Sequence, residues 1–354
     1  HRSPYVTRRS RRQIEPTEAV AMSDISDRKD DHIQLALTSD HQSLPGGSFD
    51  RVSFEHRGLP ELALSDIDIS GDFLGNLTSA PFIIGAMTGG CDNGERINQH
   101  LAEAAEQCHI PMALGSQRAA LEQGLAQKVR TWAPSATILG NLGATQLRQS
   151  GVELAKRAVD SVAANALVIH LNPLQELIQP DGDRDWNDVL EAIQNCANQL
   201  PVPIIVKEVG AGIGPITARQ LVDAGVQWIE LAGRGGTSWA SIELARNSSS
   251  RARQIAAPFI DWGMDTTELL VSVRSACADV NLIGSGGVRN GVDIAKCIRL
   301  GAQMSALAQP FLAPALESSA AVIEKIEILR EQLRWTLFLT ASKNLGALRS
   351  AAIV

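Results

Sequence analysis

Short runs of bulky apolar residues recur along the chain, each followed by a stretch with helical periodicity. In the clearest run, Ile204–Lys207, continuous β-branched residues indicate a strand that is buried on both faces. The eight runs of this kind are Pro81–Ala86, Pro111–Leu114, Thr137–Gly140, Ala166–Ile169, Pro203–Val206, Trp228–Leu231, Asn281–Gly284 and Met304–Leu307. Eight such strands alternating with helices predict an α/β fold of the (β/α)8 type, a TIM barrel.

Three regions are predicted along the chain. Residues 1–21 lack apolar periodicity and are interpreted as a disordered leader, or a remnant ahead of a natural start at Met22, with a basic binding arm as the alternative. Residues 22–80 are expected to form an N-terminal segment that packs on the barrel and covers it, and residues 81–354 form the barrel.

Finer features are expected within these regions. In the N-terminal segment, a helix is predicted over residues 27–37. The alternation of apolar and polar residues at Ile67–Ile69 predicts an exposed strand. In the barrel, the longest interval between strands contains residues 237–262 and indicates a functional loop, and Ala321–Phe338 reads as the closing helix.

Composition excludes several classes of protein. A net charge of −7 argues against nucleic acid as a partner, and no apolar run reaches the roughly 18 residues needed to span a bilayer. The five cysteines form no CxxC pair, which favours reduced core thiols of a cytoplasmic protein over metal ligands; Cys91, beside two glycines, fits that interpretation least well.

The segments after the last two strands, one rich in glycine and one in alanine, indicate a phosphate site. Gly286 and Gly287 follow the seventh strand, and Ala306 and Leu307 close the eighth. Glycine lets the backbone approach a ligand, and loops after strands seven and eight commonly bind phosphate in this fold. A tight turn without a ligand is the alternative.

Polar and flexible residues after other strands fit a flat ring that carries a phosphate. Met87, Thr88 and Gly89 follow the first strand, although a core methionine with a turn would look the same. Flavin mononucleotide (FMN) fits these parts, with Lys207 facing the N1–C2=O edge of the flavin, where reduction places negative charge. A structural salt bridge between Lys207 and Glu208 is the alternative.

The loop after the fourth strand carries both an amide and acidic groups. His170 opens it and is either a core histidine or part of the site. Glu176 lies near Asp181, Asp183 and Asp185, and an acidic loop with few protein ligands suits Mg²⁺ bridging to a phosphorylated substrate.

Taken in series, the motifs resemble the type 2, FMN-dependent isopentenyl diphosphate isomerases. The resemblance runs from about residue 28 to the last strand. It is carried by residues 28–32 (RKDDH), 58–61 (GLPE), 86–90 (AMTGG), 116–118 (SQR), 170–176 (HLNPLQE), 182–185 (GDRD), 207–210 (KEVG), 235–239 (GGTSW) and 285–289 (SGGVR). One departure is Ala232, where the family often has a serine.

The resemblance implies a role for each matching residue. It implies substrate contacts from Arg28, Lys29, Ser116, Gln117, Arg118, His170 and Gln175. It implies FMN contacts from Ala86, Met87, Thr88, Gly89, Ser116, Asn141, Lys207, Thr237, Gly286, Gly287, Arg289, Ala306 and Leu307. Glu176 would bind the metal, and Gln175 and Lys207 would be catalytic.

The same resemblance implies an activity and its requirements. The reaction is the interconversion of isopentenyl and dimethylallyl diphosphate in isoprenoid biosynthesis, by proton transfer assisted by reduced FMN. Mg²⁺, NADPH as the reductant and a homotetramer are implied as well.

Three rival functions fit the sequence less well. An FMN-dependent 2-hydroxy acid oxidase places a catalytic histidine after the sixth strand, where this chain reads Ala232–Thr237 without one. An inosine monophosphate dehydrogenase-like barrel needs a nucleophilic cysteine after a glycine-serine loop, and this chain has no cysteine at that place. A non-catalytic phosphate-binding scaffold would not need Lys207, Gln175 and Glu176 on one rim.

Overall fold

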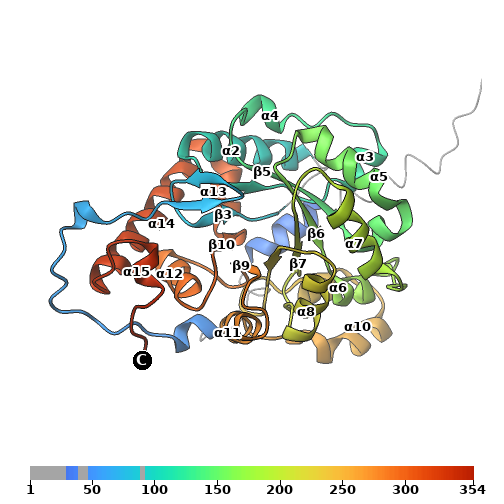
Figure 1. Cartoon of the computed structure of the whole chain (residues 1–354). Coiled ribbons are helices and arrows are strands. Elements are labelled where there is room, and N and C mark those ends of the chain that lie inside the picture. Colours follow the sequence, from blue (N-terminus) through green and yellow to red (C-terminus); the bar gives the residue numbers. More distant parts are fainter. Residues whose placement is uncertain (1–28, 39–46, 88–91) are drawn as a thin grey trace, which may run out of the picture.

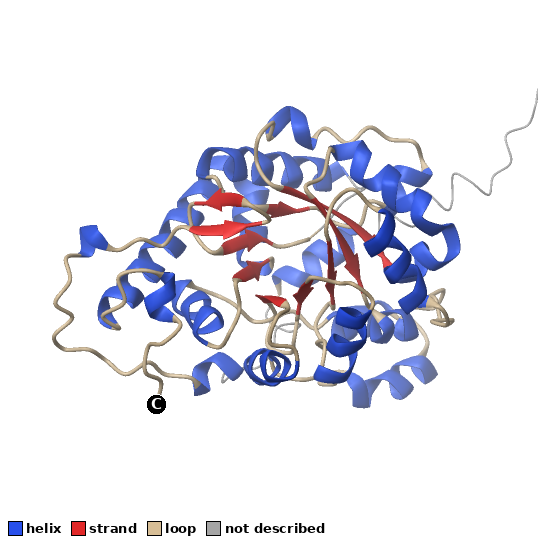
Figure 2. Cartoon of the chain, viewed as in Figure 1, coloured by secondary structure: helices blue, strands red, loops and turns tan. Residues whose placement is uncertain are grey.

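The computed structural model describes residues 29–38, 47–87 and 92–354 and confirms the predicted TIM barrel (Figures 1 and 2). Eight parallel strands in the described residues close into a ring in the order β10-β3-β4-β5-β6-β7-β8-β9. They are β3 (Phe82–Ile84), β4 (Met112–Ala113), β5 (Ile138–Gly143), β6 (Ala166–His170), β7 (Ile204–Lys207), β8 (Trp228–Glu230), β9 (Asn281–Gly284) and β10 (Met304–Leu307). Each lies within two or three residues of its predicted bounds.

Helices surround the ring of strands, as Figure 2 shows in blue around the red strands. The α-helices are α2 (Asp92–Cys108), α3 (Arg118–Glu122), α4 (Val129–Trp132), α5 (Ala144–Val162), α6 (Pro173–Ile178), α7 (Val189–Gln199), α8 (Pro215–Asp223), α9 (Trp239–Arg246), α10 (Ser250–Ala256), α11 (Thr266–Ala276), α12 (Gly291–Arg299), α13 (Gln309–Glu317), α14 (Ser319–Leu339) and α15 (Leu345–Leu348). Residues 29–37 are helical too. Short 3-10 turns lie at η2 (Ser48–Arg51), η3 (Leu64–Asp66) and η4 (Ala257–Phe259).

Strand residues alternate between two apolar layers. Side chains such as Ile205 and Ile283 point into the barrel, whereas Val206 and Ile229 pack outward under the helices. Burial on both sides explains why these strands read as continuous apolar runs rather than as alternating ones. Because all eight strands run in parallel, their carboxyl ends meet at one mouth of the barrel.

The opposite mouth is closed by a hairpin from the N-terminal segment. Strands β1 (Gly71–Phe73) and β2 (Asn76–Thr78) pair antiparallel, and Phe73 belongs to the cluster of side chains inside the barrel. Its ring meets that of Trp228 edge-on at 5.0 Å. The hairpin thus supplies the apolar plug at the amino ends of the strands.

The finer predictions met mixed outcomes. The helix near residue 27 is present over residues 29–37, the closing helix matches α14, and the long loop holds α9 and α10. The exposed strand at Ile67–Ile69 is wrong: both isoleucines are buried, and the segment makes a single bridge, between Asp68 and Asn344. Helix α15 was not predicted.

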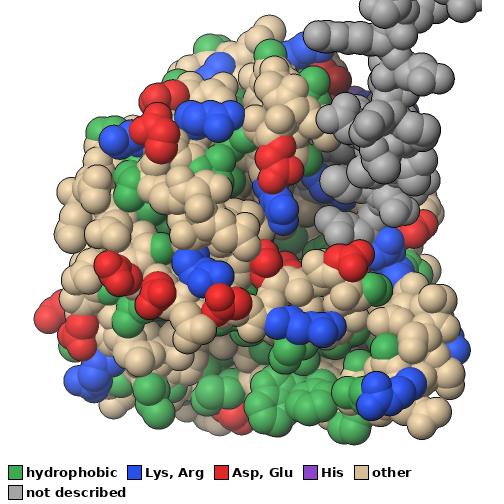
Figure 3. All heavy atoms as spheres, turned by 90° about the vertical axis from the view of Figure 1, so that its right-hand side faces the viewer, with side chains coloured by type: hydrophobic (Ala, Val, Ile, Leu, Met, Phe, Trp, Pro, Cys, Tyr) green, Lys and Arg blue, Asp and Glu red, His purple; other side chains and the backbone are tan. Residues whose placement is uncertain are grey.

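One side of the helical shell is shown in Figure 3. Acidic and basic side chains are interspersed over this face, and hydrophobic side chains gather along its lower edge. Within the described part of the chain, no helix combines the length and the apolar character needed to cross a bilayer.

Candidate active site

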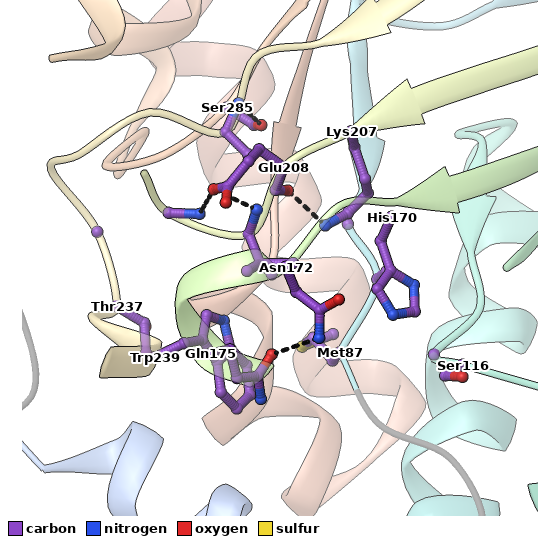
Figure 4. A pocket seen from close by; sticks show the side chains of 18 of the residues that line it. Met87, Ser116, His170, Asn172, Gln175, Lys207, Glu208, Thr237, Trp239 and Ser285 are labelled. Atoms are coloured by element: carbon purple, nitrogen blue, oxygen red, sulfur yellow. Dashed lines mark hydrogen bonds between the residues drawn. The ribbon is translucent and has the colours of Figure 1, made fainter. Parts of the chain in front are cut away.

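A cavity of about 740 Å³ opens at the mouth formed by the carboxyl ends of the strands. Its walls come from the residues that follow nearly every barrel strand, together with the helix at residues 29–37. This volume lies within the range of ligand and cofactor sites, and the carboxyl mouth is where TIM-barrel enzymes place their active sites. Figure 4 shows the side chains of several strands turned toward this one space.

Two glycine loops interlock along one wall of the cavity. Gly286 and Gly287 both have positive φ values, 91° and 82°. A Cβ atom on Gly286 would lie 2.0 Å from the carbonyl oxygen of Gly233, and one on Gly287 would lie 2.5 Å from that of Gly235. Only glycine permits this backbone conformation and approach. The loops after β8 and β9 therefore form a wall of bare backbone that suits a phosphate group.

Polar side chains, buried or half-buried, replace the apolar ones in the last inward-facing positions of the strands. The carboxamide of Asn141 donates to the Leu114 carbonyl at 2.9 Å, so its oxygen is left to accept from Nδ1 of His170 at 2.8 Å. That hydrogen bond places the proton of neutral His170 on Nδ1 and leaves Nε2 as an acceptor. Burial, with the nearby charge of Lys207, lowers the pKa of His170 to about 3.

Lys207 and Glu208 do not form the salt bridge that was the alternative reading of their sequence. The Lys207 ammonium donates to the backbone carbonyl of Glu208 at 2.8 Å. The Glu208 carboxylate instead accepts from four backbone N–H groups, those of residues 209–212. Burial raises the pKa of Glu208, and these four donors act in the opposite direction. In Figure 4, Lys207 and His170 project into the cavity from neighbouring strands.

The loop after β6 places an amide and a carboxylate side by side. Pro173 occupies the first turn of α6, where its missing N–H costs nothing. Glu176 accepts from the Asn172 side chain and from the Asp183 backbone, both at 2.8 Å. The described residues contain no cluster of three or more histidine, cysteine, aspartate or glutamate side chains suited to a metal. Glu176 thus fits Mg²⁺ only where waters and substrate oxygens complete the coordination.

A second cluster covers the cavity from the long loop after β8. Gln175 donates to Glu243 at 3.0 Å, and Glu243 also lies 3.0 Å from Nε2 of His32 and 3.2 Å from Arg246. The His32 ring meets Trp239 edge-on at 5.3 Å. Burial alone would raise the pKa of Glu243, but the contacts with His32, Gln175 and Arg246 outweigh it and lower the pKa. The cluster joins the helix at residues 29–37 to the rim.

Comparison with known proteins decides the family. Isopentenyl-diphosphate delta-isomerases from Stutzerimonas stutzeri and Cronobacter sakazakii are 48% and 45% identical to this chain. The alignments cover 92% and 93% of the chain and 96% and 97% of the relatives. The chain belongs to the isopentenyl-diphosphate delta-isomerase family.

A broader family and solved structures agree with this isomerase fold. Residues 173–354 match the family of FMN-dependent dehydrogenases. A flavocytochrome b2 variant with pyruvate bound has a TM-score of 0.67 at 18% identity, covering 95% of this chain and 85% of its own. A mandelate oxidase variant has a TM-score of 0.64 at 18% identity, covering 95% and 98%. At this identity the two structures show a shared fold alone.

Most of the residues predicted for the isomerase site line the cavity. They are Lys29, Ala86, Met87, Ser116, Arg118, Asn141, His170, Gln175, Glu176, Lys207, Thr237, Gly286, Gly287, Arg289, Ala306 and Leu307. Arg28, Thr88 and Gly89 lie outside the described residues.

Gln117 lies apart from the other predicted substrate contacts. It is not among the residues lining the cavity, and its side chain accepts from the Asn141 N–H and donates to the Ala158 carbonyl and the Ser161 hydroxyl. Its backbone N–H bonds to the Asn141 carbonyl. Gln117 therefore holds the strand ends together.

Arg118 and Arg289 line the cavity with their charges already paired. Arg118 donates to Glu122 at 2.8 Å. Arg289 pairs with Asp50 and Asp293, and these hydrogen bonds raise its pKa further above the usual range. A ligand at Arg289 therefore meets a guanidinium that two carboxylates already neutralise.

Four residues that line this isomerase cavity, or bind side chains that line it, were not predicted from the sequence. Glu230 is 8% exposed and turns into the mouth beside Lys207, its neighbour in strand register. His32, Trp239 and Glu243 form the covering cluster. Trp239 and Glu243 are four residues apart on α9, a spacing that puts both on one helix face and could have signalled them. No local signal links His32 to Glu243.

Proposed function

We propose that this chain interconverts isopentenyl and dimethylallyl diphosphate with reduced FMN held at the barrel mouth. The observation that carries the proposal is the cavity itself: a wall of bare glycine backbone and a buried lysine at a strand end line one space. Membership of the isomerase family supports the choice of reaction. When bound, reduced FMN supplies an electron-rich ring able to assist proton transfer to and from the alkene.

The chain's own residues hold the cofactor in this proposal. The backbone of Gly286, Gly287 and the loop after β10 receives the phosphate, and Met87 and Thr237 contact the ring system. Lys207 brings a positive charge to the N1–C2=O edge, where it stabilises negative charge. His170, neutral and fixed with its proton on Nδ1, offers Nε2 as an acceptor in the same cavity.

Other residues hold the substrate and exclude water. Lys29, Ser116 and Arg118 bind the diphosphate, together with Arg28 from outside the described residues. Glu176 contributes one carboxylate to Mg²⁺, whose remaining positions are filled by water and diphosphate oxygens. Gln175, held by Glu243, contacts the alkene end, where it positions the chain of the substrate or a water.

Further assignments belong to the same proposal. NADPH serves as the reductant, the assembly is a homotetramer, and the enzyme works in the cytoplasm in isoprenoid biosynthesis. The division of the chain into an N-terminal segment that packs on the barrel (22–80) and the FMN-binding barrel (81–354) belongs to it as well.

Two measurements test the proposal. The cofactor extracted from the protein, or retained after reconstitution, is identified by chromatography and is expected to be FMN; FAD would contradict the proposal. Anaerobic protein reduced with dithionite is then incubated with isopentenyl diphosphate and Mg²⁺, and dimethylallyl diphosphate is expected. Flavin reduction by 2-hydroxy acids, without isomerisation, would instead indicate an oxidase, despite Arg234 standing in the loop where those enzymes carry histidine.

A further inference from the structure

One carboxylate oxygen gathers four successive backbone amides beside the cavity. Oε2 of Glu208 accepts from the N–H groups of Val209, Gly210, Ala211 and Gly212 at 2.7, 2.7, 2.6 and 3.1 Å. Glu208 is 5% exposed, so water does not replace these bonds. The backbone of the turn after β7 is therefore held by hydrogen bonds to the side chain of the turn's own first residue.

The same turn fixes the direction of one carbonyl group. With the amides of residues 209–212 held on one oxygen, the peptide that joins Glu208 to Val209 cannot rotate freely. The Glu208 carbonyl then points back to the Lys207 ammonium, 2.8 Å away (Figure 4). Among the residues that the structure describes, Lys207 forms no ion pair with a carboxylate.

The choice of partner matters for the charge of Lys207. A carboxylate partner would fix the ammonium and neutralise it at the same time. A backbone carbonyl fixes it, uses one of its three N–H donors and does not neutralise its charge. The negative charge of Glu208, meanwhile, is directed at four amides.

We infer that Glu208 is a positioning residue, which acts on the bound flavin through Lys207 by holding the turn at residues 208–212. This inference rests on the proposed contact between Lys207 and the flavin. It goes beyond that contact in assigning a measurable effect on how strongly the reduced cofactor is bound to a residue whose carboxylate is taken up by backbone amides of its own turn.

The test is a double-mutant cycle read on cofactor binding. Dissociation constants of oxidised and reduced FMN are measured anaerobically for wild type, Glu208→Asp, Lys207→Met and the double variant. Glu208→Asp keeps the acid but shortens its reach, so it is expected to lower the oxidised-to-reduced ratio of the constants by about threefold to tenfold. In the Lys207→Met background it should change nothing further. Amide hydrogen exchange at residues 209–212 should be faster in Glu208→Asp.

The control separates positioning from loss of structure. Glu106 also holds a turn through backbone amides, those of Ser135 and Ala136 at 2.9 and 2.7 Å, and it lies outside the cavity. Glu106→Asp should therefore lower stability and leave the FMN ratio unchanged. If Glu208→Asp does not bind FMN, Glu208→Gln replaces it in the cycle. A purely electrostatic effect of the lost charge would then be equal with and without Lys207, whereas positioning makes the two unequal.

The possible outcomes distinguish a failure of the proposed contact between Lys207 and the flavin from a failure of the positioning role of Glu208. An unchanged ratio in Lys207→Met would overturn the proposed contact between Lys207 and the flavin. A lowered ratio in Lys207→Met, combined with a wild-type ratio in Glu208→Asp or with equal effects in both backgrounds, would overturn the positioning role alone.

Discussion

The two mouths of the barrel are built from opposite kinds of side chain. At the amino mouth, Phe73 is fully buried against Trp228 and the apolar cluster inside the strands. At the carboxyl mouth, the inward positions of β5 to β8 end in Asn141, His170, Lys207 and Glu230. One mouth gains stability from apolar burial, whereas the other buries polar groups that cost stability and suit chemistry. Substitutions at the two mouths should thus separate stability from function.

The largest effect is expected at the closed mouth. Phe73→Ala should lower the free energy of unfolding by about 3–5 kcal/mol, because it removes a fully buried ring and leaves a cavity. Urea denaturation measures the loss. Leu77→Ala, at a residue of the same hairpin that is 78% exposed, should cost no more than about 0.5 kcal/mol. Equal losses in the two variants would show that the hairpin is not a plug.

Lys207→Met tests the open mouth with a side chain of similar length. The free energy of unfolding of the apoprotein should stay within about 1 kcal/mol of wild type or rise, because a buried charge is removed. Binding of reduced FMN should weaken by about 1.5–3 kcal/mol, the range for a hydrogen bond to a charged group. Anaerobic titration and urea denaturation measure the two quantities. A large loss of stability with unchanged FMN binding would reverse the comparison.

Substitutions of two neighbouring residues at the open mouth, Gln175 and Glu176, should change different kinetic quantities. Glu176→Gln should raise the Mg²⁺ concentration for half-maximal rate by about tenfold or more, and extra Mg²⁺ should restore part of the activity. Gln175→Ala should lower the rate at an unchanged Mg²⁺ midpoint, because an amide does not anchor a cation. Initial rates of the reduced, FMN-loaded enzyme decide this. The assignment is wrong if the midpoint moves in Gln175→Ala and not in Glu176→Gln.

The smallest effect concerns pH. The pKa of His170 is lowered to about 3 in the folded protein, so between pH 3 and 6.5 the unfolded chain binds a proton that the native state does not. Stability must therefore fall as the pH drops below about 6.5, by about 1.4 kcal/mol at pH 5.5 from this residue alone. His170→Gln should remove that part of the loss. Urea midpoints of the apoproteins at pH 7.5 and 5.5 compare the two; parallel losses would contradict the neutral histidine.

Much of the barrel was predictable because each strand is marked by its own local sequence. The continuous apolar residues of Ile204–Val206 are typical of a strand buried on both faces. In a parallel barrel the functional residues lie at the carboxyl ends of such strands, so their position was predictable too. The predicted strand at Ile67–Ile69 was wrong, because a strand needs a pairing partner and the alternation of apolar residues does not identify one. The orientation of Gln117 was out of reach for a related reason: only the packing decides whether a carboxamide at a strand end faces the cavity or the wall.

The covering cluster shows the limit of the site prediction. His32 and Glu243 meet because the helix at residues 29–37 lies over the mouth, and their separation in sequence hides the contact. A salt bridge between Glu208 and Lys207 was the alternative to the flavin contact, since adjacent opposite charges suggest one. The turn instead gives the carboxylate to backbone amides, a choice set by the geometry of residues 209–212.

The closure of the ring by β10 against β3 has a consequence for how the protein is made. The last barrel strand to leave the ribosome pairs with the first, and the glycine loop at residues 284–287 is made only after the seventh strand. A nascent chain therefore carries an open sheet with two unpaired edges and no complete cofactor wall until its eighth strand emerges. A complete cofactor wall therefore requires a closed ring, so tightly bound flavin reports that all eight barrel strands have been made and have paired.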